Sequence, residues 1–144
     1  MLSISPYISS IIIAWLVAHL IKYLIALRRG RELDFVRQIF ISGGMPSSHT
    51  ATAVALWTVI MFKDGVGSGL FGLATLVVLI IAYDAVKVRR SSGEQGKAIT
   101  QLIKESDSKV RAPRTAKGHT PIEVIAGSLL GFLTGATIVF FASI

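Results

Sequence analysis

The sequence of 144 residues contains no cysteine, which excludes disulfides, thiolate metal sites and a cysteine nucleophile. Acidic residues are also few, with eight Asp or Glu against 15 Lys or Arg. They form no cluster of the kind that holds a hard metal ion, so we expect neither a metal nor another cofactor. No basic residue precedes the first apolar stretch, and no A-x-A-like site follows it. This pattern argues against a cleaved signal peptide.

Apolar residues, in contrast, make up 52% of the chain, and the mean hydropathy is +0.66. Such values are high for a soluble domain and ordinary for a membrane protein. The net charge of +7 would suit nucleic acid, but the basic residues form two clusters between long apolar runs, without interleaved aromatic residues. Cytoplasmic loops of a membrane protein explain that pattern better. We therefore expect a single membrane-embedded domain over residues 1–144 and no nucleic-acid partner.

Four apolar runs predict an all-α bundle with four transmembrane helices, at about residues 8–27, 48–62, 70–88 and 121–144. The second run makes only about 22 Å of helix, against a hydrocarbon core of about 30 Å. We therefore expect its N-terminal end to lie below the headgroups, inside a cleft. Two polar segments carry apolar residues at helical spacing and are expected to form short interfacial helices. These residues are Leu33, Val36, Ile39 and Phe40 in the first segment, and Ile99, Leu102 and Ile103 in the second.

The basic residues predict the orientation of these helices. Five lie between Lys22 and Arg37, nine lie between Lys87 and Lys117, and only Lys63 falls between the second and third apolar runs. Loops rich in Lys and Arg stay on the cytoplasmic side. We therefore expect both long loops in the cytoplasm, both termini outside, and the cell (plasma) membrane as the location.

This topology brings four helix ends together at the cytoplasmic face. Helix N-termini present free N–H groups and the positive end of the helix dipole, and Lys or Arg at neighbouring ends completes a cage for a tetrahedral oxyanion. The second and fourth helices begin with Pro46-Ser47-Ser48-His49 and His119-Thr120-Pro121-Ile122-Glu123, while the first and third end with Lys22 to Arg29 and with Asp84, Lys87, Arg89 and Arg90. The residues thus predict an anion site.

Most of these residues also have an interpretation without function. Ser47 and Ser48 can cap a helix, and Thr120 to Glu123 matches a capping box with proline at its favoured position. Caps do not account for His49 or His119, since histidine is the side chain that exchanges protons near neutral pH. Glu123, four residues after His119, can fix the tautomer of its ring and raise its basicity.

The remaining polar residues also have interpretations other than phosphate binding. Lys22 can extend to the interface, and Arg89-Arg90 can act only as topology-determining charge. Asp84 lies within an apolar run and needs a cationic partner, for which Lys87 or an arginine of another helix would serve, so we expect it to position a cation rather than to catalyse. A doubled GxxxG face suits close helix packing and leaves room for a homo-oligomer; its members are Gly127, Gly131 and Gly135.

Together, these motifs resemble those of the type 2 phosphatidic acid phosphatase superfamily, which includes vanadium haloperoxidases and bacterial acid phosphatases. Its motifs are K-x6-R-P, P-S-G-H and S-R-x5-H-x3-D. Lys22 and Arg29 have the first spacing, with Gly30 in place of proline; residues 46–49 match the second, with Ser48 for glycine; and His119 and Glu123 match the end of the third. Pro113 stands where the third motif has arginine, and Arg111, Arg114, Arg89 or Arg90 could replace it. The whole chain is similar to a small divergent membrane branch of the superfamily.

The resemblance implies a phosphatase that hydrolyses a lipid or isoprenyl phosphate monoester or pyrophosphate. His119 would form a phosphohistidine, Glu123 would orient it, and His49 would protonate the leaving oxygen. The expected phosphate-binding residues are Lys22, Arg29, Ser47, Ser48, Arg89 and Arg90. One alternative is a non-catalytic membrane protein that binds phosphate or lipid headgroups, as a transport component or a structural partner. Another is a bundle in which the histidines serve only stability.

Overall fold

The computed structural model describes residues 5–30, 44–106, 108–113, 115 and 118–142, and these are helical or irregular with no strand among them. The predicted all-α class is therefore confirmed for this part of the chain. In chain order the elements are α1 (Pro6–Arg28), α3 (Ser48–Lys63), α4 (Gly69–Tyr83), a π-helical turn (Asp84–Val88), α5 (Arg89–Glu105) and α6 (Pro121–Ala142). The predicted interfacial helix with Leu33, Val36, Ile39 and Phe40 lies outside the described residues.

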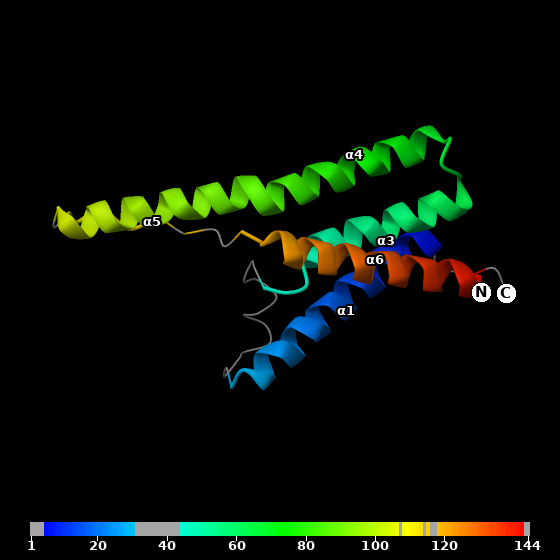
Figure 1. Ribbon diagram of the computed structural model, residues 1–144, viewed down its shortest axis with the longest axis horizontal. Helices are drawn as coiled ribbons and strands as arrows, with labels where there is room; N and C mark the ends of the chain where they lie inside the picture. Colours follow the sequence, from blue (N-terminus) through cyan, green and yellow to red (C-terminus); the bar gives the residue numbers. More distant parts are fainter. Residues whose placement is uncertain (1–4, 31–43, 107, 114, 116–117, 143–144) are drawn as a thin grey trace.

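Helix α3 lies at the centre and contacts α1, α4 and α6 (Figure 1). Its closest neighbour is α6, whose glycines face its backbone. A Cβ added at Gly127 would lie 2.5 Å from the carbonyl oxygen of Ser47, and one at Gly135 would lie 2.6 Å from that of Ala55. Gly131 meets the Ala51 carbonyl in the same way. The GxxxG face thus packs inside one chain, and an oligomer, which stays a prediction, would need another surface.

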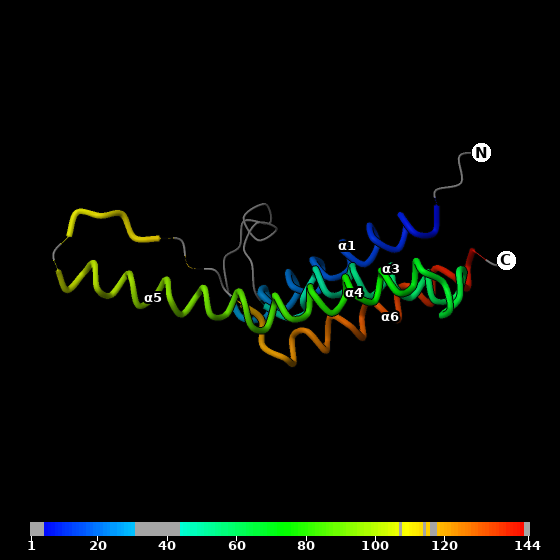
Figure 2. Tube along the Cα trace, turned by 90° about the horizontal axis from the view of Figure 1, so that it is seen from above, coloured from blue at the N-terminus to red at the C-terminus, as the bar shows by residue number. Residues whose placement is uncertain are grey.

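The third apolar run is part of a much longer helix than the sequence predicted. Residues Gly69–Glu105 form 37 continuous helical residues, about 56 Å at 1.5 Å per residue. In both whole-chain views α5 continues α4 beyond the other helices (Figures 1 and 2). The predicted helix around Ile99, Leu102 and Ile103 is therefore present as part of α5, but it continues from α4 instead of being a separate short helix. The segment 89–105 has no proline, so nothing forces the helix to end at the edge of the apolar run.

Three helices are long and apolar enough to cross a membrane: Pro6–Arg28, Gly69–Glu105 and Pro121–Ala142. Large apolar side chains cover their outer surfaces, among them Leu16, Leu79 and Phe140, which are 53%, 62% and 65% exposed. Such exposure suits contact with lipid. Helix α3 has only 16 residues, so by length and composition the described residues provide three spans where the sequence predicted four.

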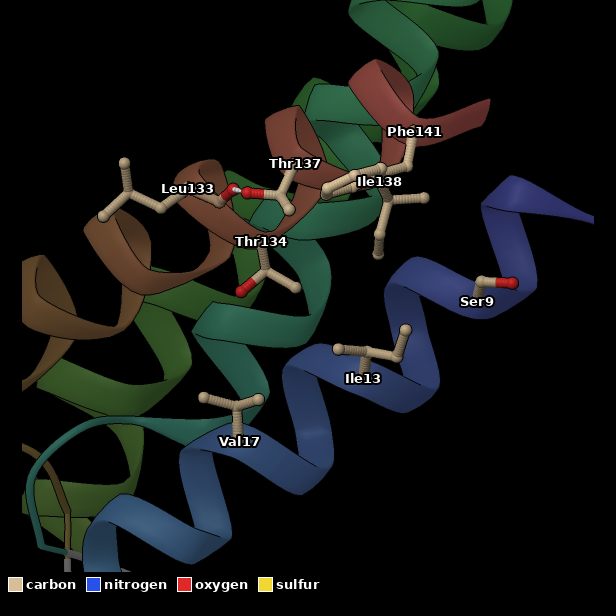
Figure 3. Close-up of a pocket in the computed structure, with 8 residues that line it drawn as sticks. All are labelled: Ser9, Ile13, Val17, Leu133, Thr134, Thr137, Ile138 and Phe141. Carbon is tan, nitrogen blue, oxygen red and sulfur yellow. Dashed lines mark hydrogen bonds between the residues drawn. The ribbon is translucent and has the colours of Figure 1, made fainter. Parts of the chain in front are cut away.

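An apolar groove of about 520 Å³ lies between α1 and α6. Figure 3 shows Ile13 and Val17 of α1 facing the last turns of α6 across it. Its lining residues are Ser9, Ile13, Val17, Leu133, Thr134, Thr137, Ile138 and Phe141. They come from the first half of α1 and the second half of α6. The charged and histidine side chains predicted as functional lie toward the opposite ends of both helices.

Candidate functional site

A small cavity of about 160 Å³ lies where α3 begins, α4 ends and α6 begins. Three of the four helix ends that were predicted to meet therefore lie together at this cavity, and no residue of α1 lines it. Five of the lining residues are polar or charged, and the two isoleucines come from the last turn of α4. The cavity is lined by Ser47, His49, Ile80, Ile81, Asp84, Ala85, Arg89 and His119.

The start of α3 is capped by Ser47, as one interpretation of the sequence predicted. Its Oγ accepts a hydrogen bond from Thr50 N at 3.4 Å and lies 2.9 Å from Thr50 Oγ1. Ser47 N in turn donates to the carbonyl oxygen of Glu123 at 3.0 Å. The beginning of α3 is thereby fixed to the first turn of α6.

The predicted capping box at α6 is also formed. Thr120 N donates to Glu123 Oε2 at 3.1 Å, and Glu123 N donates to Thr120 Oγ1 at 3.4 Å. The same carboxylate oxygen lies 3.0 Å from His119 Nδ1. Because a carboxylate only accepts, Nδ1 of the neutral ring carries the proton, and Nε2 keeps a lone pair. The cap and the histidine contact therefore coexist at one carboxylate.

The His119 side chain is only 5% exposed. This burial lowers the pKa of His119 below its ordinary value, and the nearby positive charges of Lys22 and Arg89 lower it further, while the hydrogen bond to Glu123 opposes the shift. The neutral imidazole is thus favoured at pH 7. A neutral ring with its tautomer fixed is the form that can act as a nucleophile.

Lys22 reaches the start of α3 from α1. It is 8% exposed, and its Nζ donates to Ser48 Oγ at 3.3 Å. A lysine buried in this way does not extend to the interface, so the snorkelling interpretation does not describe it. His49, in the first turn of the same helix, is exposed.

The two neighbouring arginines on the third helix differ in their surroundings. Arg89 lines the cavity and forms a salt bridge with Asp84. Asp84 thus has the cationic partner that was predicted, but the partner lies on the same helix and is neither Lys87 nor an arginine of another helix. Arg90 pairs with Glu94 at 3.2 Å, is 61% exposed and borders a second cleft of about 510 Å³, which His119 also lines. Arg29 is exposed after the last residue of α1 and does not line the cavity.

Sequence reasoning missed two backbone contacts that hold His119 in place. His119 N donates to the carbonyl oxygen of Ala85 at 2.9 Å. Gly118 lies so close to the third helix that an added Cβ would be 2.6 Å from Arg90 N. The glycine directly before the histidine was a possible signal of close approach, whereas the carbonyl of an alanine carries no signal in the sequence.

Within the described part of the chain, no three His, Asp or Glu side chains lie close enough together to hold a metal ion. The charged groups at the cavity instead combine cations, a fixed imidazole and an exposed imidazole. Such a set can bind an oxyanion and transfer a proton.

Comparison with known proteins agrees with the motifs. The sequence profile of the divergent PAP2 family matches residues 5–134. The chain is also 34% identical to the protein named "Uncharacterized membrane protein YuiD" from Bacillus subtilis (strain 168), over 151 residues that cover 94% of each chain. No solved structure matches significantly. The matched residues include the entire cavity, and the chain therefore belongs to the divergent PAP2 family of membrane proteins.

Proposed function

We propose that this protein is a membrane phosphatase that hydrolyses a lipid or isoprenyl phosphate, as a monoester or pyrophosphate, through a phosphohistidine intermediate. One observation carries the proposal: the buried ring of His119 contacts Glu123 at 3.0 Å and lines a cavity that also contains His49 and Arg89. A helix cap needs none of these additional residues. The family membership makes the same chemistry a reasonable expectation.

In the first step, Nε2 of His119 attacks phosphorus while the bond from phosphorus to the substrate oxygen breaks. His49 gives that oxygen a proton, since an alkoxide is a poor leaving group. In the second step, His49 accepts a proton from water as the water oxygen attacks phosphorus. The bond to His119 breaks, and inorganic phosphate is released.

Positive groups around the cavity would stabilise the charge on the phosphoryl oxygens, which is where most catalysis of phosphoryl transfer lies. Arg89 lines the cavity, and Lys22 bonds to Ser48, between the lining residues Ser47 and His49, without lining the cavity itself. The first N–H groups of α3 add the positive end of its dipole. Arg29 and Arg90 do not line this cavity.

The cavity favours an amphiphilic substrate. Its volume of about 160 Å³ suits a phosphoryl group rather than a whole lipid, and Ile80 and Ile81 form an apolar wall beside the charged groups. Helix α4, which carries both isoleucines, has no buried residue. A phosphate attached to a hydrocarbon chain could therefore enter with its chain against α4 and the surrounding membrane lipids.

The proposed topology has α3 as a fourth, short crossing. Its 16 residues make about 24 Å of helix, so the cavity would lie slightly below the headgroups. The distribution of basic residues supports a topology in the cell membrane with the cavity and the long loops in the cytoplasm and both termini outside. Labelling of single cysteines introduced at Ser68 and Ser108 would test this, because only the second should react from the cytoplasmic side.

The test of the function is phosphate release by the purified protein from a panel of phosphatidic, lysophosphatidic and isoprenyl phosphates. His119→Gln should abolish turnover and labelling by radioactive phosphate. His19→Gln is the matched control, because His19 is 8% exposed and bonded to the Trp15 carbonyl but lies outside the cavity. Full activity in His119→Gln would refute the assignment of the nucleophile.

The alternative is a non-catalytic protein that binds phosphate or lipid headgroups. The replacement of the third-motif arginine by Pro113 favours it, because binding tolerates such a loss better than catalysis does. A wild-type protein that binds phosphate, releases none from the whole panel and forms no phosphohistidine would establish this alternative.

A further inference from the structure

The third helix changes its register beside the cavity. At the π-helical turn Asp84–Val88, Arg89 N donates to the carbonyl oxygen of Asp84, five residues back, instead of the fourth residue back as in an α-helix. Turns of this kind are rare and occur frequently at functional sites. Here the change of register has two consequences for the cavity.

The first consequence concerns Asp84 and Arg89. Residues five apart on a regular α-helix point about 140° away from each other. Across the π turn, both line the same cavity and Arg89 Nε bonds to Asp84 Oδ2. That bond leaves both terminal amino groups of the guanidinium available as donors.

The second consequence concerns the backbone of His119. In a regular α-helix, Arg89 N would donate its hydrogen bond to the carbonyl oxygen of Ala85. Because Arg89 N bonds to Asp84 instead, the Ala85 carbonyl is left to accept the bond from His119 N, at 2.9 Å. Ala85 is only 4% exposed, so this bond is shielded from water. One turn thus holds the backbone of His119 and places a cation next to its ring.

Arg90 shows the contrast within the same helix. It follows the π turn, pairs with Glu94 in ordinary i, i+4 geometry and is 61% exposed. It lines the larger cleft of about 510 Å³, which His119 also borders, but it does not line the small cavity that His119 shares with His49, Asp84 and Arg89. The two arginines are adjacent in sequence, and the register of the helix decides that only Arg89 lines the small cavity.

We infer that Arg89, held by Asp84 across the π turn, is the arginine that binds the phosphoryl oxygens of the substrate, in place of the arginine missing at position 113. The inference rests on the proposed phosphatase function for its substrate, but the binding of a tetrahedral oxyanion does not need turnover. Arg89 contacts the phosphoryl group, and Asp84 is a positioning residue that acts through Arg89.

The decisive comparison is Arg89→Ala against Arg90→Ala in the full-length protein in detergent. We expect Arg89→Ala to lower kcat/KM by about 10²- to 10³-fold, as for other single donors to a transition-state oxyanion, and to weaken inhibition by vanadate. Arg90→Ala should stay within about threefold of wild type, because its side chain is exposed. Added guanidinium should restore part of the activity of Arg89→Ala and none of that of His119→Gln.

Direct binding of inorganic phosphate and vanadate, measured by calorimetry, separates this inference from the proposed function. If the wild-type protein binds phosphate without turnover, Arg89→Ala should still lose binding, and the phosphatase proposal alone fails. If Arg90→Ala loses binding while Arg89→Ala keeps it, the inference is wrong whatever the activity.

Asp84→Asn tests the positioning role. It should raise KM more than it lowers kcat, and the double variant with Arg89→Ala should be no worse than Arg89→Ala alone, because both changes act through one guanidinium. Additive losses in this double-mutant cycle would show that Asp84 acts independently of Arg89. Deleting Val88, which is 51% exposed, shortens the turn by one residue and should reproduce the loss of phosphate binding if the protein remains monodisperse.

Discussion

The two helix beginnings at the cavity carry the same side chain in different surroundings. His119 precedes α6, is buried and contacts Glu123, whereas His49 lies within the first turn of α3 and is exposed. A backbone bond of 3.0 Å from Ser47 N to the Glu123 carbonyl joins the two beginnings. A buried ring with a fixed tautomer suits a nucleophile, and an exposed ring suits proton exchange with water. Their different surroundings therefore support different proposed roles for two chemically identical side chains.

The largest expected effect is the loss of His119. In His119→Ala, turnover of every phosphate substrate should fall by about 10⁴-fold or more, because removal of a nucleophile leaves only binding and charge stabilisation. Phosphate release from a lipid phosphate and from an aryl phosphate measures this. A selective loss with the lipid substrate alone would contradict a nucleophilic role.

His49→Ala should distinguish the same two substrates. A lipid alkoxide needs a proton, so its hydrolysis should fall by about 10²- to 10⁴-fold. A nitrophenyl phosphate has a leaving group that needs no proton, and its hydrolysis should fall much less. Equal losses with both substrates would remove the distinction between the histidines.

Glu123→Gln should remove the carboxylate that orients His119 and raises the basicity of its ring. Because the hydrogen bond and charge of Glu123 raise the pKa of His119, their removal should lower that pKa further. The acidic limb of the activity profile should move to lower pH, while activity at neutral pH should fall by about 10- to 100-fold. Profiles from pH 5 to 8 measure both effects, and a limb that moves to higher pH would contradict the contact with His119.

Stability should depend on pH through the same histidine. Its folded-state pKa is lowered, so the unfolded chain binds more protons as the pH falls through about 6.5. The contribution is fully present above that pH and is lost below it. Thermal unfolding in detergent between pH 7.5 and 5.5 should show a falling Tm, with a smaller fall in His119→Gln.

The smallest effects should come from the two caps. Ser47→Ala removes the Oγ that accepts from Thr50 N and should cost about 1 kcal/mol of unfolding free energy. Thr120→Ala should cost about half as much, because Thr120 is exposed and water can replace its oxygen. Neither change should abolish activity, and denaturant titrations give both values.

Much of this site could be predicted from local patterns and from the alternating direction of successive apolar helices. The caps at Ser47 and Thr120, the pair of His119 and Glu123, and the meeting of helix ends each follow from short-range chemistry or from simple topology. Arg89 and Arg90 show where such reasoning ends. They are adjacent and identical in type, and only the register of the helix separates them. No residue between Asp84 and Val88 indicates the π turn, and no proline marks an end of the helix between α4 and α5.

The seam between α3 and α6 limits which sequences the fold can accept. A side chain at Gly127, Gly131 or Gly135 would clash with backbone atoms of α3. Because every residue has these backbone atoms, no substitution in α3 could relieve the clash. Any such substitution would separate Ser47 from Glu123 and so move the two histidines apart. In a survey of all single substitutions, these three glycines should tolerate change as poorly as His119, although none of them lines the cavity.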